Sequence, residues 1–199
     1  MASNKSHLYD ASSITVLEGL EAVRMRPGMY IGSVSTRGLN HLIYEIVDNA
    51  VDEHLAGFCT EIHVTLEADG SATVEDNGRG IPVGMHAQGV SAERVVYTTL
   101  HAGGKFGHDA YKTSGGLHGV GSSVVNALSL RMTVRVSRDG KIYQDTYERG
   151  NPTTPLEKGL LPVVGKSSKT GTLVNFLPDP DIFERTRFKE DEVINRLHE

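Results

Sequence analysis

The chain has 199 residues, of which 38% are hydrophobic and 23% are charged, and its formal net charge is −5. This composition can bury a core, which excludes a wholly disordered chain, and the acidic balance disfavours a basic nucleic-acid-binding surface over the whole domain. The single cysteine, Cys59, excludes an internal disulfide framework and a multi-cysteine zinc site. No apolar run reaches the roughly 18 residues of a membrane span, so we expect a cytoplasmic protein without membrane contact.

Hydrophobic spacing predicts the elements of the first half of the chain. They are a polar arm at residues 1–14, a short helix ending before Pro27, a loop at 28–38, a helix at 38–57, and two strands at 62–66 and 72–74. The helix at 38–57 is the clearest, because apolar residues from Leu39 to Val51 recur at positions i, i+3, i+4 and i+7. Asp69-Gly70 is typical of a hairpin turn between the two strands.

The second half is predicted to continue the same domain, which would span residues 15–199. Its elements are a helix at 91–100 capped by Ser91, a helix at 119–128, strands at 132–136, 142–148 and 173–177, a loop at 150–170, and a helix from Phe188. Strands joined by hairpins favour an antiparallel or mixed sheet. We therefore expect an α+β two-layer sandwich with helices on one face. The last helix has no stop signal before Glu199, so we expect a fragment of a longer protein.

One face of the helix at 38–57 carries an acidic stripe. Its members are His41, Glu45, Asp48, Asn49, Asp52 and Glu53. A solvated polar face is the ordinary explanation, but no lysine or arginine lies within 38–57 to pair with these acids. Oxygen ligands suit Mg²⁺, so Asn49 is a candidate ligand and Glu45 a candidate general base supported by His41. Arg79 is a candidate partner for Glu53 or Asp52.

A second motif, Asp76-Asn-Gly-Arg-Gly-Ile-Pro82, follows the strand at 72–74. A simple turn would explain it, because Asp-Asn-Gly is strong turn chemistry. Alternatively, Asp76 accepts a hydrogen bond from an exocyclic amine such as that of adenine, while Gly78 and Gly80 let a flat ring approach the backbone. Spacing alone leaves both explanations open.

A glycine-rich stretch precedes the helix at 119–128. Seven glycines fall between Gly103 and Gly121. Backbone N–H groups before a helix can bind an anion, and Lys105 adds a positive charge to the same stretch. A flexible surface loop is the alternative. The spacing excludes both a Rossmann fingerprint and a Walker A loop.

The three motifs in this order resemble the Bergerat-type (GHKL) ATPases, the family that includes gyrase, the large heat-shock chaperones, histidine kinases and the mismatch-repair protein MutL. Longer strings are similar to the ATPase domains of bacterial type IIA topoisomerases, those of DNA gyrase B first and those of ParE from topoisomerase IV nearly as well. These strings are Arg24-Met-Arg-Pro-Gly-Met-Tyr-Ile-Gly32, Glu45-Ile-Val-Asp-Asn-Ala50, Asp76-Asn-Gly-Arg-Gly-Ile-Pro82, Leu100-His-Ala-Gly-Gly-Lys-Phe106 and Ser114-Gly-Gly-Leu-His-Gly-Val-Gly121. Together they cover essentially the whole chain.

The resemblance implies a domain that binds and hydrolyses ATP with Mg²⁺. Glu45 would activate the attacking water with support from His41, and Asn49 would bind the metal. The family supplies a second lysine to the γ-phosphate from a following domain, which this chain lacks. We therefore expect ATP binding with poor turnover by the chain alone.

The resemblance also implies the residues of the nucleotide pocket. Asp76 would accept the adenine amine in a partly water-mediated network with Thr172. Arg79, held by Glu53, and Pro82 would flank the adenine. The remaining implied contacts are Gly80, Ile81, Lys105, Tyr111, Gly116, Leu117, His118, Gly119, Val120, Gly121 and, from the N-terminal arm, Tyr9.

The implied partners belong to the complete topoisomerase. ATP would join two copies of the chain, with Tyr9 and Ile14 of the arm reaching the partner's nucleotide site. This clamp would hold a DNA segment for negative supercoiling, or for decatenation if the protein is the ParE type. The gyrase A protein, or ParC, would join through other domains. Aminocoumarin-type inhibitors would contact the outer rim of the pocket, including Arg138.

Three other hypotheses fit the motifs less well. A histidine kinase would have a phospho-acceptor helix hairpin before the domain, and the string Leu100-His-Ala-Gly-Gly-Lys105 is foreign to kinases. The same strings argue against a chaperone or a mismatch-repair ATPase. A nucleotide-binding module without turnover remains open for this chain by itself. The sequence does not distinguish gyrase from topoisomerase IV.

Overall fold

The computed structural model describes residues 19–100 and 121–199. Its helices are α2 (Leu20–Met25), α3 (Gly28–Ile31), α4 (Thr36–Leu55), α5 (Ala92–Thr98), α6 (Gly121–Ala127) and α7 (Glu190–His198). Its strands are β1 (Ile62–Leu66), β2 (Ala72–Asp76), β3 (Ser129–Arg138), β4 (Lys141–Glu148), β5 (Asn151–Pro152), β6 (Val163–Lys166) and β7 (Gly171–Pro178). The predicted arm at 1–14 lies outside the described residues.

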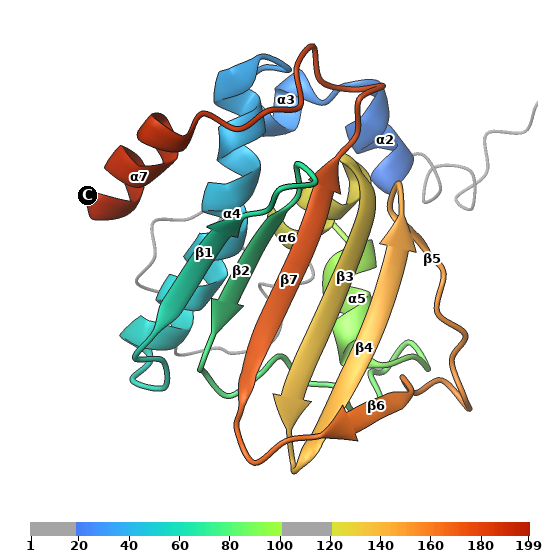
Figure 1. The fold of residues 1–199 in the computed structure, drawn as a ribbon. Coiled ribbons are helices and arrows are strands. Elements are labelled where there is room, and N and C mark those ends of the chain that lie inside the picture. The colour runs from blue at the N-terminus through green and yellow to red at the C-terminus, as the bar shows by residue number, and fades with distance from the viewer. Residues whose placement is uncertain (1–18, 101–120) are drawn as a thin grey trace, which may run out of the picture.

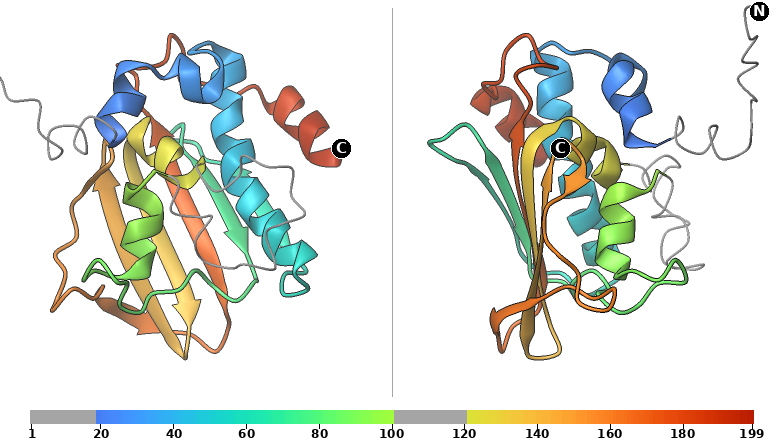
Figure 2. Two further views of the ribbon diagram at one scale, coloured as in Figure 1. Left: turned by 180° about the vertical axis from the view of Figure 1, so that it is seen from behind. Right: turned by 90° about the vertical axis from the view of Figure 1, so that its right-hand side faces the viewer.

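The described residues form two layers (Figures 1 and 2). One layer is a seven-stranded sheet in the order β1-β2-β7-β3-β4-β5, with β6 paired to β4. Every pairing between these strands is antiparallel. Helices α4, α5 and α6 cover one face of the sheet. This arrangement confirms the expected α+β sandwich with helices on one face.

Helix α4 packs on the sheet through the apolar stripe that its sequence predicts. Leu39, Leu42 and Ile43 are completely buried, and the stripe stays buried as far as Ala50. Burial of each such side chain contributes roughly 1.5–3 kcal/mol, so the stripe fixes which face of α4 points away from the sheet. The helix begins at Thr36 and therefore includes Arg37, so it is not free of basic residues as predicted.

The two predicted hairpin turns are present. Gly70 and Gly140 have φ of +90° and +77°, which glycine adopts without strain. Asp69 Oδ1 accepts hydrogen bonds from the backbone nitrogen and the hydroxyl of Ser71 at 2.9 and 2.6 Å. These bonds, together with one from Arg131, lower the pKa of Asp69 to about 2. The turn between β1 and β2 is thus held by an aspartate that bonds to the residue two positions on.

Two segments predicted as loops contain regular structure. Residues 28–31 form α3, because Pro27 has φ −59° and ψ −37° and so starts a helix. Within the predicted loop at 150–170, β5 and β6 each pair with β4. An edge strand offers unpaired backbone groups, and these short strands bond to them. The local proline content predicted a loop and could not report that pairing.

Ser91 precedes α5 but does not cap it with its side chain. Its hydroxyl donates to the carbonyl oxygen of Val83 at 2.7 Å, and no side-chain hydrogen bond caps the helix. The predicted role of Ser91 as the N-cap is therefore wrong. The fully buried hydroxyl instead ties the start of α5 to the loop that follows β2.

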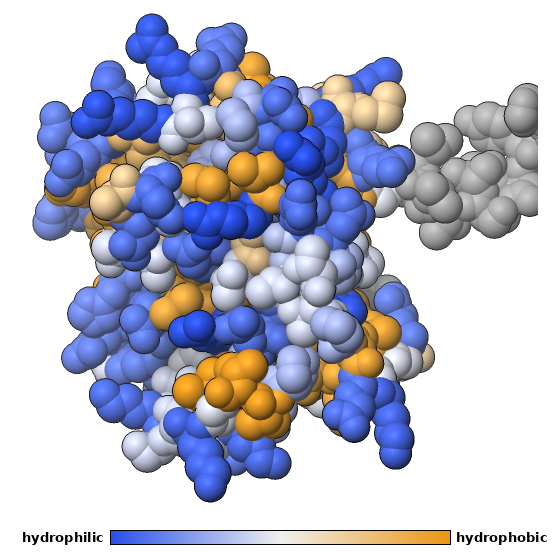
Figure 3. Space-filling view, turned by 45° about the vertical axis from the view of Figure 1, so that its right-hand side comes forward, coloured by the Kyte–Doolittle hydropathy of each residue, from blue (hydrophilic) through white to orange (hydrophobic). Residues whose placement is uncertain are grey.

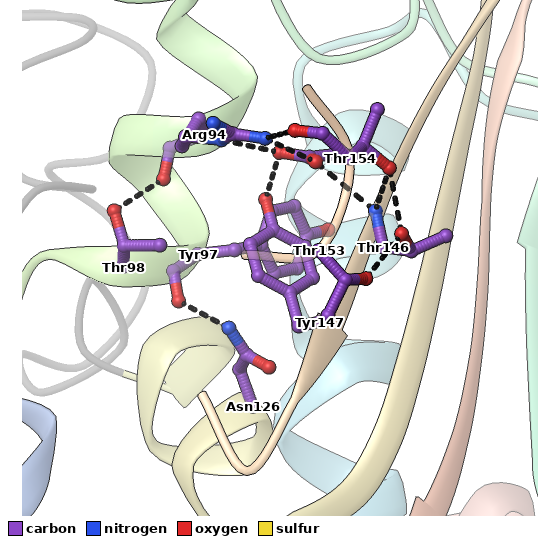
Figure 4. Close-up of polar contacts among 9 residues, drawn as sticks. Arg94, Tyr97, Thr98, Asn126, Thr146, Tyr147, Thr153 and Thr154 are labelled. Carbon is purple, nitrogen blue, oxygen red and sulfur yellow. Dashed lines mark hydrogen bonds and ion pairs between the residues drawn. The ribbon is translucent and has the colours of Figure 1, made fainter. Parts of the chain in front are cut away.

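A buried charged cluster joins α5 to β4 (Figure 4). Arg94 Nη2 and Nε donate to the two carboxylate oxygens of Asp145 at 2.8 and 3.0 Å. Tyr147 Oη donates to Asp145 at 2.6 Å, and Arg94 Nη2 also donates to the carbonyl oxygen of Thr154 at 2.6 Å. The Asp145 side chain is 0% exposed and that of Arg94 is 14% exposed. The pair is therefore almost fully removed from water.

Glu93, the neighbour of Arg94 on α5, is buried without compensation. It is 0% exposed, and neither carboxylate oxygen has a hydrogen-bond partner among the described residues. Burial, and then the negative charge of Asp145, raise the pKa of Glu93 well above its usual 4.5. Folding is therefore opposed by ionisation of this carboxyl.

We expect this carboxyl to make stability fall as pH rises. Because the pKa is raised in the folded state, the contribution of Glu93 is full below pH 4.5 and is lost as pH rises through the folded-state pKa. Glu93→Gln should remove a fall of up to about 1.4 kcal/mol per pH unit, measured by urea unfolding at a series of pH values. The exposed Glu75→Gln is the control. Parallel profiles for the parent and Glu93→Gln would contradict this account.

The surface carries apolar side chains in separate places. Exposed examples are Met25, Met29, Leu55, Val163 and Val164. Figure 3 shows apolar residues in several patches among hydrophilic ones on the face it draws. Isolated apolar residues of this kind are usual on protein surfaces. In the described parts of the chain, no helix has the length and apolar character that crossing a bilayer requires.

Candidate functional site

Helix α4 presents four of the predicted residues at intervals of four positions: His41, Glu45, Asn49 and Glu53. This spacing places them on one face, one turn apart. His41 Nε2 lies 2.8 Å from Glu45 Oε1, which is the contact that the predicted support of Glu45 by His41 requires. The Glu45 side chain is 17% exposed, so the acidic stripe is partly covered rather than fully solvated.

The first residues of α6 lie directly against this face of α4. A Cβ added at Gly121 would collide with the carboxylate of Glu45, so only glycine permits this approach. Asn49 Nδ2 donates to Ser122 Oγ at 2.6 Å. Gly121 and Ser122 therefore face the candidate base and the candidate metal ligand. The sequence did not point to Ser122, because only the packing of α6 on α4 brings it to Asn49.

Asp76 lies at the end of β2 and is largely buried. Its Oδ1 accepts a hydrogen bond from the backbone nitrogen of Gly78 at 2.8 Å, which is the turn contact that the sequence allowed. Burial raises the pKa of Asp76, although hydrogen bonds from the backbone of Gly78 and Thr172 oppose the rise. The turn uses one carboxylate oxygen, so the turn and the amine-acceptor explanations are compatible.

Thr172 lies opposite Asp76 in the pairing of β2 with β7. Its hydroxyl oxygen accepts a hydrogen bond from the backbone nitrogen of Ile81 at 3.2 Å. The loop after β2 is thereby attached to the start of β7. Two of the predicted pocket residues, Asp76 and Thr172, thus come together with a third, Ile81.

Gly80 brings the same loop close to β3. Its φ is +82°, and an added Cβ would lie 2.9 Å from Val136 Cγ1 and 3.0 Å from the carbonyl oxygen of Ser137. Arg138 Nη1 donates to the carbonyl oxygen of Gly80 at 3.1 Å. A larger residue at position 80 would therefore push the loop away from the sheet, and glycine is required for both conformation and space.

Arg79 pairs with Glu53, one of its two predicted partners. Arg79 Nη2 donates to Glu53 Oε1 at 2.7 Å, and the backbone nitrogen of Arg79 donates to Oε2 at 3.0 Å. Burial raises the pKa of Glu53, but the hydrogen bonds from Arg79 outweigh it and the net shift is downward. The guanidinium also lies 3.8 Å from the centre of the Phe58 ring. These contacts attach the loop to the end of α4.

Several predicted residues lie outside the described part of the chain. They are Tyr9, Ile14, Lys105, Tyr111, Gly116, Leu117, His118, Gly119 and Val120. Of the others, Pro82 is exposed next to Ile81. Within residues 19–100 and 121–199, no three His, Cys, Asp or Glu side chains come together as a metal site. A magnesium ion bound by Asn49 would take other ligands from water and phosphate, as this ion commonly does.

A helix that carries a carboxylate and an asparagine, next to an aspartate at a strand end and a glycine loop on an antiparallel sheet, defines the Bergerat class of ATP-binding domains. The chain belongs to the family described as Histidine kinase-, DNA gyrase B-, and HSP90-like ATPase, whose model matches residues 35–180.

Its relatives include both kinds of bacterial type II topoisomerase. The chain is 63% identical to the DNA gyrase B protein of Thermotoga maritima over 192 residues, which are 96% of this chain and 29% of that protein. It is 58% identical to the B-type protein of DNA topoisomerase 4 from Streptococcus pneumoniae serotype 4 over 193 residues, again 96% and 29%. The chain thus spans less than a third of the length of these relatives.

A solved structure confirms the fold. The 43K ATPase domain of Thermus thermophilus gyrase B, crystallised in complex with an aminocoumarin, matches with a TM-score of 0.78 and 48% identity. The match covers 93% of this chain and 46% of that one.

Proposed function

We propose that this chain is the ATP-binding and ATP-hydrolysing domain of a bacterial type IIA topoisomerase, with DNA gyrase B as the first candidate and ParE of topoisomerase IV as the alternative. The observation that carries the proposal is the contact of the start of α6 with Glu45 and with Asn49. It brings a carboxylate and an amide oxygen-bearing side chain next to the glycine-rich stretch that ends at Gly121. High identity to both kinds of topoisomerase supports the same assignment.

In this proposal the residues divide the work of phosphoryl transfer to water. Asp76, with Thr172, binds the adenine amine. Glu45 takes a proton from the attacking water, and His41 holds its carboxylate in position. Asn49 holds Mg²⁺, which when bound neutralises charge on the phosphates. Such a reaction depends on positioning and charge neutralisation more than on covalent chemistry, which suits this set of residues.

The residues outside the described ranges complete the proposed site. Lys105, Tyr111 and residues 116–120 contact the triphosphate, and Tyr9 reaches the nucleotide of a second copy. In the longer protein, located in the cytoplasm, ATP-driven dimerisation clamps a DNA segment, and the gyrase A protein or ParC completes the enzyme. The rim near Arg138 is the proposed contact for aminocoumarins, the inhibitor class named for the Thermus thermophilus structure.

Two measurements test this function. The longer protein, combined with its DNA-cleaving partner, should supercoil relaxed plasmid in the presence of ATP if it is gyrase, or decatenate linked circles without supercoiling if it is topoisomerase IV. The 199-residue chain should bind ATP but hydrolyse it at least tenfold more slowly than the longer protein, because the lysine of the following domain is missing. Absence of any ATP-dependent topological change would contradict the proposal, as would equal turnover by the chain and the longer protein.

A further inference from the structure

The contact between Asn49 and Ser122 joins a proposed metal ligand to a residue with no assigned role. Asn49 Nδ2 donates to Ser122 Oγ at 2.6 Å, and Ser122 is only 7% exposed. The contact lies beside the approach of Gly121 to Glu45. A buried hydroxyl therefore determines which end of the Asn49 amide faces α6.

The two ends of an asparagine amide differ in chemistry but hardly in shape. Only the oxygen can bind a hard cation, because the nitrogen carries two donor hydrogens and no available lone pair. A rotation of the amide by half a turn exchanges the two ends, and little opposes it unless one end is bonded. At Asn49 the nitrogen is the bonded end. The oxygen is then turned away from Ser122.

The surroundings of Ser122 favour its role as an acceptor for Asn49. Burial, and then the nearby charges of Glu93 and Asp76, raise the pKa of Tyr97, while a hydrogen bond from Ser122 acts in the opposite direction. The hydroxyl hydrogen of Ser122 is thus directed to the buried Tyr97, which leaves an oxygen lone pair for Asn49. One hydroxyl links α5, α6 and α4 in a fixed order of donors and acceptors.

We propose that Ser122 is a positioning residue that holds the Asn49 amide with its oxygen toward the bound Mg²⁺. The inference rests on the proposed function, since it concerns the metal ligand of that site. Ser122 acts through Asn49 and does not itself touch the nucleotide or the metal. Its removal should therefore weaken the gain in affinity that Mg²⁺ gives, and leave metal-free nucleotide binding unchanged.

The test is calorimetric titration of the chain with a non-hydrolysable ATP analogue, once with Mg²⁺ and once with EDTA. In Ser122→Ala the affinity in EDTA should stay within about twofold of the parent, and the gain from Mg²⁺ should fall about fivefold, the size expected for one hydrogen bond. Ser122→Thr keeps the hydroxyl and should restore the gain. The matched control is Ser129→Ala, which removes an equally buried hydroxyl that donates to the carbonyl oxygen of Val125 at 2.7 Å, remote from Asn49.

Two results would overturn the inference. An undiminished Mg²⁺ gain in Ser122→Ala would show that the amide does not need Ser122. Equal losses of affinity in Mg²⁺ and in EDTA would assign Ser122 to the packing of the pocket. If the parent chain itself does not bind the analogue, or binds it without any Mg²⁺ gain, the proposed function fails at the parent and the inference fails with it. The failure of the inference alone is seen only in the variants.

Discussion

Replacing Glu45 with glutamine in the longer protein is expected to abolish ATP turnover while nucleotide binding survives. Glutamine has the size of glutamate, so it keeps the packing against Gly121 and the neighbourhood of His41. It has no lone pair of comparable basicity to take the proton of the attacking water. A positioned general base contributes about 10²–10⁴-fold, so turnover should fall by at least about 10²-fold.

The measurement is steady-state ATP hydrolysis beside titration with a non-hydrolysable analogue. Glu75→Gln, at an exposed position of β2, serves as a matched charge-removal control and should leave both quantities unchanged. Turnover within a few-fold of the parent in Glu45→Gln would contradict the role of Glu45. Loss of binding together with turnover would make Glu45 a structural residue of the pocket.

The largest loss of stability is expected from breaking the buried pair of Arg94 and Asp145. Arg94→Ala leaves the Asp145 carboxylate, which is 0% exposed, without its guanidinium partner. Removal of one member of a buried pair typically costs about 3–5 kcal/mol, because the remaining charge stays buried. Urea unfolding should show that loss in the free energy of unfolding.

An exposed pair of the same residue types provides the control. Arg131 and Asp69 pair at 2.7 Å with side chains 48% and 53% exposed, so Arg131→Ala should cost no more than about 1 kcal/mol. The double variant Arg94→Met with Asp145→Leu removes both buried charges and should recover much of the stability lost in Arg94→Ala. Equal effects of the two arginine substitutions would show that burial of the Arg94 pair carries no special cost.

The local features of the fold could be predicted because short-range physics determines them. The stripe from Leu39 to Ala50 requires only the helical period, and the turns at Gly70 and Gly140 require only residues that accept positive φ. The pairing of Arg79 with Glu53 could be proposed from charge alone, although its geometry depended on the position of the loop.

The features that were missed depend on residues far apart in the sequence. β5 and β6 exist because β4 has an edge to pair with, which no local pattern reports. Ser91 resembles an N-cap in sequence, but a carbonyl oxygen of Val83 competes for its hydroxyl. Glu93 is a charged residue in a buried position, and no local pattern around it indicates that burial.

The candidate site divides in the same way. The spacing of His41, Glu45 and Asn49 follows from one helix and was predicted. The contacts of Gly121 and Ser122 with that helix follow from tertiary packing, and Ser122 was not predicted. The glycine-rich stretch before Gly121 remains a prediction, because it lies outside the described residues.

The most direct measurement of the central claim is calorimetric titration of the chain with a magnesium-bound, non-hydrolysable ATP analogue, for the parent, Asp76→Ala and Asp69→Ala. Both aspartates accept a hydrogen bond from the backbone nitrogen two residues on, so the control removes the same turn contact elsewhere. The account predicts binding by the parent and by Asp69→Ala, with loss of binding in Asp76→Ala. Equal binding by all three would contradict it, because Asp76 would then be a turn residue and not the acceptor of the adenine amine.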